Sequence, residues 1–256
     1  MQHPINPFLS ALRADRPQIG YWLALASDHV AEAVASVGFD WLLIDGEHGP
    51  NNLQTALQQM RAIAPYDSHP VARLVNDDVA LIKQYLDVGF QTLLIPMVDT
   101  AEQAARIVGA MHYPPHGFRG DGAAIARASR WGQVADYMDN ASAQLCCLVQ
   151  AETTAALSNL EAIANTDGVD GVFFGPADLS ASMGHPGNAG HPDVQKAIFD
   201  GIAVVRRAGK AAGIITTQRE AAQAYLTAGA RFVAVGADSI SLMQSARALR
   251  ADFPVG

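Results

Sequence analysis

The chain has 256 residues, of which half are hydrophobic and only 16% are charged. This length and composition argue against a disordered chain and allow either one large α/β domain or two small ones. The formal net charge of −8, from 17 basic and 25 acidic residues with no basic cluster, disfavours nucleic acid or a membrane surface as a partner.

The cysteines and the N-terminal segment indicate a cytoplasmic protein. Cys146 and Cys147 are the only cysteines and are adjacent within the apolar run LCCLV, so we expect buried, reduced thiols and no disulfide. Residues 1–17 lack a cationic start followed by an apolar core, so no secretion signal is predicted. No apolar stretch approaches the roughly 18 residues that a membrane span requires.

Short apolar runs alternate with helical patterns along the whole chain. Eight strands are predicted, at residues 19–25, 41–45, 71–74, 92–97, 145–150, 171–174, 213–216 and 232–235. Helical patterns follow at residues 28–37, 51–63, 77–88, 100–109, 153–165, 190–208, 218–228 and 239–252. Most of the strands are continuously apolar, as strands covered on both faces are. Eight β/α units in about 250 residues predict a single (β/α)8 TIM barrel over residues 1–256, with a doubly wound open sheet as the alternative.

One long irregular segment, residues 112–139, interrupts this alternation after the fourth unit. It contains YPPHGFRGDGAAIARASRW, and loops of this length in a compact domain are typically functional or lie at an interface. No G-x-G-x-x-G or Walker-type loop follows a predicted strand, which disfavours nucleotide binding.

Polar side chains follow several of the predicted strands. The second strand, in FDWLLIDGEHGPNN, delivers Asp45, Glu47 and His48, and the third ends at Arg73. The fifth and sixth strands deliver Gln150, Glu152 and Asp178. Because the carboxyl ends of barrel strands meet at one mouth, where active sites form, we expect these side chains to converge.

Each of these residues also has a purely structural interpretation. Arg73 is compatible with a salt bridge at the barrel rim, and Glu152 with an acidic residue at a helix N-terminus. Asp178 is compatible with a turn or cap residue, and His48 with a solvent-facing loop residue. The convergence of an arginine, a histidine and several carboxylates on one mouth favours a metal-assisted site.

The choice of metal follows from the ligand types. Carboxylates with room for waters and a substrate suit a hard divalent ion such as Mg²⁺ or Mn²⁺. No H-E-x-x-H motif is present, and the one H-x-x-x-H pair, His112 and His116, lies in the irregular segment around Pro114 and Pro115, so a zinc site with several histidine ligands is disfavoured. The three lysines, Lys83, Lys196 and Lys210, lie in helical patterns or before the seventh strand. No Schiff-base lysine is therefore expected in the mouth, and carbonyl chemistry there would use a metal.

Five parts of the sequence resemble the HpcH/HpaI aldolases, which are metal-dependent class II pyruvate aldolases. They are GFDWLLIDGEHGPNN, KQYLDVGFQTLLIPMV, YPPHGFRGDG with ARASRW, LVQAET and GVDGVFFGPADLSASMG, and the resemblance runs from about residue 8 to residue 253. It implies a (β/α)8 barrel of the phosphoenolpyruvate/pyruvate type, commonly a hexamer of two trimers with an exchanged C-terminal helix. It also implies reversible cleavage of 4-hydroxy-2-oxo acids to pyruvate, or a close relative, and an aldehyde.

The resemblance further implies a metal centre and a base. A divalent metal (Mg²⁺, Mn²⁺ or Co²⁺) would be held by Glu152 of the V-Q-x-E-T motif and Asp178 of the G-P-A-D motif. His48 would act as the base, and Asp87 in the L-D-V-G segment would raise its basicity. Asp45 and Glu47 are then expected to position the loop and water.

Substrate contacts are implied in the same way. Arg73 would hold pyruvate and steady the enolate, while Gln150, the backbone at Ala177 and the metal ligand Asp178 would touch substrate. The segment LVNDDVALIK departs from the P-S-W-N-D-P form of similar sequences, a change expected to affect helix entry. GIITTQRE places Ile215 and Thr216 on the aldehyde side, so the aldehyde is left open among succinic semialdehyde, tartronate semialdehyde and lactaldehyde.

Two other functions are compatible with the same barrel. One is a CoA-thioester lyase of the citrate-lyase-like branch, which the acidic composition disfavours because such chains carry more basic residues for the CoA phosphates. The other is a non-catalytic barrel that only binds a 2-oxo acid. The presence of a base, an arginine and both metal carboxylates argues against this second alternative.

Overall fold

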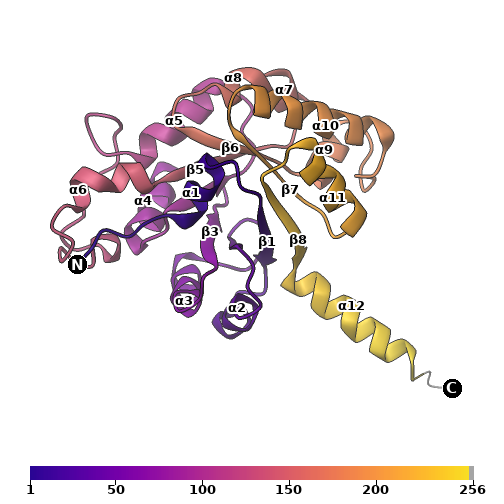
Figure 1. Ribbon diagram of the computed structural model, residues 1–256, viewed down its shortest axis with the longest axis horizontal. Coiled ribbons are helices and arrows are strands. Elements are labelled where there is room, and N and C mark those ends of the chain that lie inside the picture. The colour runs from indigo at the N-terminus through magenta and orange to yellow at the C-terminus, as the bar shows by residue number, and fades with distance from the viewer. Residues whose placement is uncertain (254–256) are drawn as a thin grey trace.

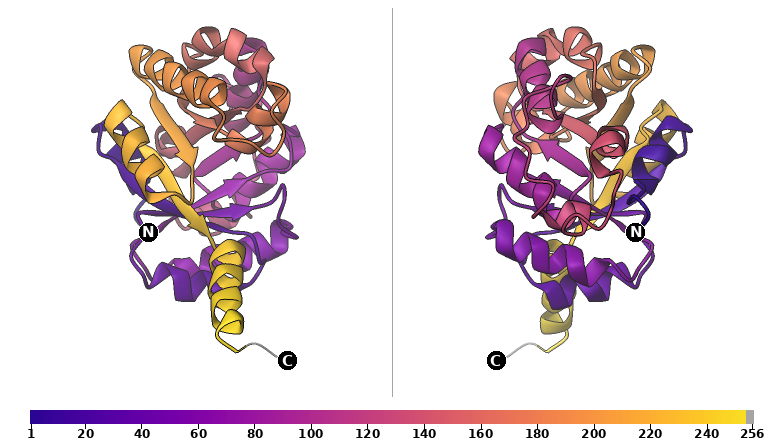
Figure 2. Two further views of the ribbon diagram at one scale, coloured as in Figure 1. Left: turned by 90° about the vertical axis from the view of Figure 1, so that its right-hand side faces the viewer. Right: turned by 90° about the vertical axis from the view of Figure 1, so that its left-hand side faces the viewer.

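The computed structural model describes residues 1–253, in which eight parallel strands form one closed barrel. The strands follow one another around the barrel in chain order, so the predicted TIM barrel is confirmed and the open sheet is wrong. Figures 1 and 2 show the strands at the centre with helices arranged around them. The last three residues of the predicted domain, 254–256, lie outside the described residues.

The eight predicted strands are all present, with ends shifted by at most a few residues. They are β1 Gln18–Leu23, β2 Trp41–Asp45, β3 His69–Arg73, β4 Thr92–Ile95, β5 Cys146–Ala151, β6 Val169–Phe174, β7 Ala211–Ile215 and β8 Phe232–Ala237. The register pairs Asp45, the last residue of β2, with Arg73, the last residue of β3. The two polar strand ends are therefore neighbours at the same rim of the barrel.

The outer helices largely match the predicted helical patterns. They are α2 Asp28–Ala35, α3 Leu53–Ile63, α4 Val79–Val88, α5 Ala101–Met111, α7 Thr154–Ser158, α8 Leu160–Ala164, α10 Pro192–Arg207, α11 Arg219–Ala228 and α12 Asp238–Ala251. The pattern at 153–165 is two helices because the backbone at Asn159 leaves the helical region, at φ −103° and ψ 6°. The prediction missed the helices α1 Pro7–Arg13 and α9 Pro176–Ser182, as well as short helices in the irregular segment.

Helix α1 closes the amino-terminal end of the barrel. Asn6 caps it by accepting the backbone N–H of Leu9 at 2.9 Å. Phe8 packs into the barrel interior, with its ring centroid 5.8 Å from that of Trp41 and 6.0 Å from that of Phe232. Burying an aromatic side chain of this size stabilises the fold by roughly 1.5–3 kcal/mol. Because α1 fills the amino-terminal end of the barrel, the opposite, carboxyl end is the open mouth.

The irregular segment after α5 folds into a small cluster of its own. It contains the short helices η1 Arg127–Ser129, α6 Tyr137–Asn140 and η2 Ala141–Gln144. Its buried side chains include Tyr113 and Tyr137. Arg119 lies buried in this segment with its guanidinium 4.5 Å from the centre of the Tyr113 ring. The segment is thus a packed part of the fold rather than an open loop.

Helix α12 leaves the barrel and extends away from it (Figures 1 and 2). Every residue from 240 to 253 is exposed, including the apolar side chains of Ile240, Leu242, Met243, Leu249 and Phe253. Within residues 1–253, we find no helix with the length and apolar character that crossing a membrane requires. Both cysteines are buried and free, as predicted.

Candidate active site

Arg73 is fixed at the barrel mouth by two acidic residues. Its Nε and Nη2 donate to the two oxygens of Asp45 at 2.9 and 2.8 Å, and Nη1 lies 2.8 Å from Glu47 Oε2. The guanidinium also stacks over the ring of Trp22 at 4.4 Å. Two of the five guanidinium N–H groups bond Asp45, and Nη1 approaches Glu47 without a hydrogen bond, so at least two N–H groups are free for another ligand. A buried arginine held in this way suits a planar anionic group.

Asp45 also shapes the loop that carries His48. Its Oδ1 accepts the backbone N–H of Glu47 at 3.0 Å and of His48 at 3.3 Å. Gly46 is required here, because a Cβ at that position would lie 2.6 Å from the backbone oxygen of Arg73. The expectation that Asp45 positions this loop is therefore confirmed. One carboxylate couples the arginine to the histidine loop.

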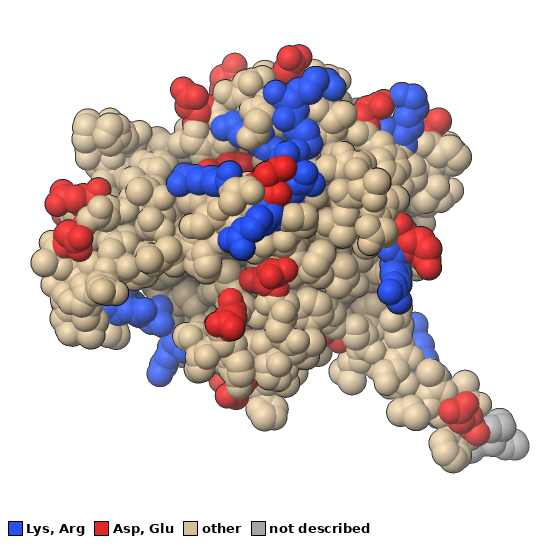
Figure 3. Space-filling model, in the orientation of Figure 1, with Lys and Arg blue, Asp and Glu red and all other residues tan. Residues whose placement is uncertain are grey.

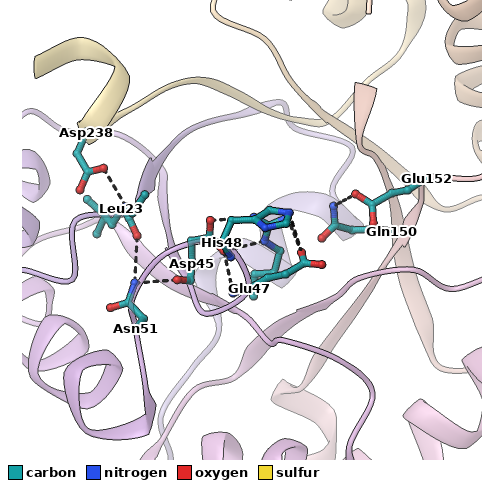
Figure 4. A network of polar contacts seen from close by, with 10 residues as sticks. Leu23, Asp45, Glu47, His48, Asn51, Gln150, Glu152 and Asp238 are labelled. Atoms are coloured by element: carbon teal, nitrogen blue, oxygen red, sulfur yellow. Dashed lines mark hydrogen bonds and ion pairs between the residues drawn. The ribbon is translucent and has the colours of Figure 1, made fainter. Parts of the chain in front are cut away.

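The side chain of His48 is free to meet a substrate. It is 65% exposed, and its Nε2 lies 4.0 Å from Glu47 Oε2. Because this contact is long and the ring is open to solvent, the imidazole can exchange protons with a bound molecule. Figure 4 shows Asp45, Glu47 and His48 on one side of the site and Gln150 and Glu152 on the other.

Gln150 and Glu152, from the end of β5, form the other side of the site. Gln150 Nε2 donates to Glu152 Oε1 at 2.7 Å, and the backbone N–H of Met97 donates to Glu152 Oε2 at 3.1 Å. Met97 adopts the left-handed conformation with φ 55°, which is uncommon for a non-glycine residue. Gly175 allows close approach, since a Cβ there would lie 2.1 Å from Glu152 Oε1.

The carboxylates of the site outnumber its buried cation. Burial, together with the nearby charges of Glu47 and Asp178, raises the pKa of Glu152 to about 7 against the opposing effects of the Met97 N–H and Arg73. Burial also raises the pKa of Glu47, which Arg73 and His48 oppose. Asp178 lies exposed in the first turn of α9. Because the pKa values of Glu47 and Glu152 are both raised, an added cation would stabilise their charged forms.

The donor set fits a divalent metal ion between Glu152 and Asp178. Both offer carboxylate oxygens, the ligands that hard ions such as Mg²⁺ and Mn²⁺ prefer. The Oε1 atom of Gln150 is buried and has no hydrogen-bond partner among residues 1–253, so it is available to a further ligand. The residues present therefore suit the predicted metal.

Two predicted site residues, Ala177 and Asp87, have surroundings that differ from those of the residues described above. Ala177 is exposed and borders a groove of about 600 Å³ that Ile215 and Thr216 also line. Asp87 lies on α4, where its Oδ1 accepts from Arg119 Nη2 at 2.6 Å. Over residues 1–253, we find no hydrogen bond or ion pair that joins Asp87 to His48.

Three residues near the mouth were not predicted. Trp22 and Met97 have no charged side chain to mark them in the sequence. Asp238 is buried and accepts the backbone N–H groups of Ala24 and Leu25 at 2.8 and 3.1 Å, which fixes the chain after β1. Asp238 directly follows β8, so it carries the same sequence signal as Arg73 and Glu152, a polar residue at the end of a strand.

A closed barrel with acidic residues, an arginine and an exposed histidine at its carboxyl end defines an enzyme of the (β/α)8 class. A family model described as HpcH/HpaI aldolase/citrate lyase matches residues 18–245. The chain belongs to this family, which confirms the resemblance seen in the sequence.

Similar proteins cover nearly the whole chain. A "hydroxypyruvate/pyruvate aldolase" of Pseudomonas aeruginosa is 56% identical over 256 residues, which is all of this chain and 96% of that protein. A "4-hydroxy-2-oxo-heptane-1,7-dioate aldolase" of Klebsiella pneumoniae is 58% identical, covering 97% of this chain and 94% of that one. A crystal structure of an HpcH/HpaI aldolase/citrate lyase family protein from Burkholderia cenocepacia superposes with a TM-score of 0.93 at 40% identity, over 96% of this chain and 98% of that one.

Proposed function

We propose that this chain is a metal-dependent aldolase that reversibly cleaves 4-hydroxy-2-oxo acids, such as 4-hydroxy-2-oxoheptanedioate, to pyruvate and an aldehyde. The observation that carries the proposal is the buried Arg73, held by Asp45 and lying at the same mouth as His48, Glu152 and Asp178. The names of relatives at 56–58% identity agree with this reaction. We further propose that the whole chain acts as one barrel domain.

Arg73 and Gln150 are proposed to bind the 2-oxo acid. The two free N–H groups of Arg73 are oriented by Asp45 and lie beside the position where negative charge develops as the C3–C4 bond breaks. Because the guanidinium is already buried and held, it needs little reorganisation when that charge appears. Gln150 and the backbone at Ala177 complete the contacts with the oxo acid.

His48 is proposed to take the proton of the C4 hydroxyl as the bond breaks. The electrons of that bond pass to the enolate of pyruvate, which becomes pyruvate when C3 takes a proton, and the hydroxyl carbon leaves as the aldehyde. In the reverse direction, His48 returns the proton to the new hydroxyl. Glu152 and Asp178 are proposed to hold Mg²⁺, Mn²⁺ or Co²⁺, which supplies Lewis-acid stabilisation of the enolate oxygen when bound.

Asp87 is proposed to act on His48, as the resemblance implies, although its partner within one chain is Arg119. The Asp87→Asn variant tests this role through the pH profile of kcat/KM. A residue that favours the charged imidazole should, when neutralised, shift the acidic limb of the profile, where the base becomes protonated, to lower pH. A merely structural residue would lower stability and leave the pH profile in place.

Assembly and location are also proposals. Helix α12 exposes apolar side chains along residues 240–253, which supports its packing on a second copy of the chain. We propose that the protein is a hexamer of two trimers with this helix exchanged, and that it acts in the cytoplasm on aromatic-compound breakdown products.

The deciding experiment measures pyruvate release, coupled to lactate dehydrogenase, over a panel of 4-hydroxy-2-oxo acids. We expect activity that is lost with EDTA and restored by Mn²⁺, Co²⁺ or Mg²⁺, and full activity in EDTA would disprove the metal role. The same assay with CoA thioesters tests the citrate-lyase-like alternative. In Figure 3, basic side chains gather on the upper middle of the drawn face, with acidic side chains among them. No turnover of any substrate would favour a barrel that only binds 2-oxo acids.

A further inference from the structure

A second group of metal-ligand side chains lies outside the mouth, between α9 and α10. It consists of His185, His191 and Asp193, and one ligand atom of each lies within 4.8 Å of the other two. The two imidazole rings are stacked, with centroids 3.5 Å apart and planes inclined by 12°. His185 Nε2 and His191 Nδ1 lie 3.9 and 3.8 Å from the same oxygen, Oδ2 of Asp193.

The backbone between the two histidines holds them together. The N–H of Asn188 donates to the His185 carbonyl at 3.0 Å, and the N–H of His191 donates to the Asn188 carbonyl at 3.0 Å. Gly184 and Gly187 occupy the left-handed region, at φ +84° and +74°, which lets the chain turn back on itself. The pairing of two histidines six positions apart is therefore a property of the fold and does not follow the usual H-x-x-x-H spacing.

This group is accessible to a metal ion. His191 Nδ1 accepts the backbone N–H of Asp193 at 3.2 Å, so an ion that binds this nitrogen would replace a capping hydrogen bond. Both rings are about 30% exposed and Asp193 is 71% exposed, so an ion can reach them from solvent.

We propose that His185, His191 and Asp193 form a second cation site, which binds a transition-metal ion such as Zn²⁺, Ni²⁺ or Cu²⁺. Two imidazoles and a carboxylate, with solvent in the remaining position, are a typical ligand set for these ions. At Zn–N distances of about 2.0–2.1 Å, tetrahedral ligand atoms lie roughly 3.4 Å apart. The three ligand atoms, now within 4.8 Å of one another, would have to move closer, and the stacked rings would have to tilt so that their lone pairs meet at one ion. The carboxylates at the mouth prefer harder ions, which distinguishes the two sites.

The site borders the groove next to Ala177. Ala189 and Gly190, in the loop between the two histidines, line this groove together with Thr216. An ion on His185 and His191 would tie the ends of that loop together. We therefore expect bound metal to slow hydrogen exchange of the backbone amides in residues 185–193.

The test uses the untagged, metal-stripped full chain carrying Glu152→Gln, so that binding at the mouth is weakened. Zn²⁺ is titrated calorimetrically in the presence of excess Mg²⁺. We expect His185→Ala and Asp193→Asn to weaken Zn²⁺ binding by at least about tenfold, while the exposed, unrelated His116→Ala leaves it unchanged. Equal Zn²⁺ affinity in the His185→Ala variant and its parent would overturn the proposal.

A second variant separates metal binding from helix capping, because His191 is the N-cap of α10. His191→Asn keeps a good capping side chain but removes the imidazole. We expect this variant to unfold at the parent's temperature without metal and to lose the protection of residues 185–193 by Zn²⁺. Retained protection would show that His191 is only a cap. Because the measurement needs no turnover, it is independent of the proposed aldolase activity.

Discussion

The carboxylate of Asp45 binds Arg73 through two nearly parallel hydrogen bonds, and its Oδ1 also accepts the backbone N–H groups of the loop that carries His48. The β2–β3 register makes this possible, because it places the two residues opposite each other at the ends of their strands. The proposed substrate-binding group and the proposed base are thus positioned by one side chain.

Asp45→Ala should destabilise the protein by about 3–5 kcal/mol, because it leaves the buried guanidinium of Arg73 without its main partner. Aldol cleavage should fall as well, since the His48 loop loses its two side-chain acceptor contacts. Denaturant unfolding and the pyruvate assay measure both effects. Asp77→Ala is the matched control, because its ion pair with the half-exposed Arg106 should contribute at most about 1 kcal/mol. Equal effects of the two substitutions would contradict the assigned role of Asp45.

His48→Ala should reduce kcat by about 10²–10⁴-fold, the usual contribution of a positioned general base. The fold should be retained, because this side chain is 65% exposed and no hydrogen bond of its ring appears among residues 1–253. The exposed His29→Ala provides the control for loss of a surface imidazole. A variant that unfolds like the parent and keeps its kcat would remove His48 from the mechanism.

The fold was largely predictable because the strands of a barrel are apolar on both faces. Every residue of β2 is buried, as the unbroken run at 41–45 predicts. The missed helices α1 and α9 are only seven residues long. Each begins at a proline, whose fixed φ suits the first helical position, but so short a segment contains less than two full helical repeats.

The site was predictable to the extent that it consists of polar residues at strand ends. This rule found Arg73 and Glu152, which the structure places at the mouth from opposite sides. It did not find Trp22, because an aromatic residue in a strand has the same sequence pattern whether it packs in the core or under a guanidinium. The left-handed backbone of Met97 has no sequence signal, since glycine would be the expected residue there.

Glu152→Gln should weaken Mn²⁺ binding by more than about tenfold, because it replaces a proposed charged ligand with a neutral amide. The structure should tolerate the change, since burial already raises the pKa of Glu152 to about 7 and the neutral form is accessible. Calorimetric titration of the metal-stripped protein measures the affinity. Glu161→Gln, on the exposed face of α8, is the control. Unchanged Mn²⁺ affinity in Glu152→Gln would exclude this residue as a ligand.

His69 should make the fold sensitive to mild acid. Burial lowers the pKa of His69 to about 3, and its Nε2 lies 2.8 Å from Thr92 Oγ1. The unfolded chain binds a proton near pH 6.5 and the folded chain does not, so stability present above pH 6.5 is lost as the pH falls toward 3. Between pH 7.5 and 5 the loss is about 2 kcal/mol. Unfolding free energies of the parent and His69→Gln at both pH values measure it. The change in unfolding free energy between the two pH values should be larger by that amount in the parent than in His69→Gln. An equal change in both proteins would contradict the prediction.

Leu242→Glu and Met243→Glu should break the proposed assembly, because each puts a charge on the exposed apolar surface of α12 that we expect a second copy to cover. Light scattering after size exclusion should give a mass near six times the 27.1 kDa chain for the parent and a smaller mass for these variants. Gln244→Glu adds the same charge at a polar position of the same helix and should leave the mass unchanged. The barrel should stay folded in all three variants, since residues 240–253 are exposed in the single chain. Two results would show that α12 does not hold the copies together. One is a parent that is already monomeric, and the other is a full-sized assembly of the variant that combines Leu242→Glu and Met243→Glu.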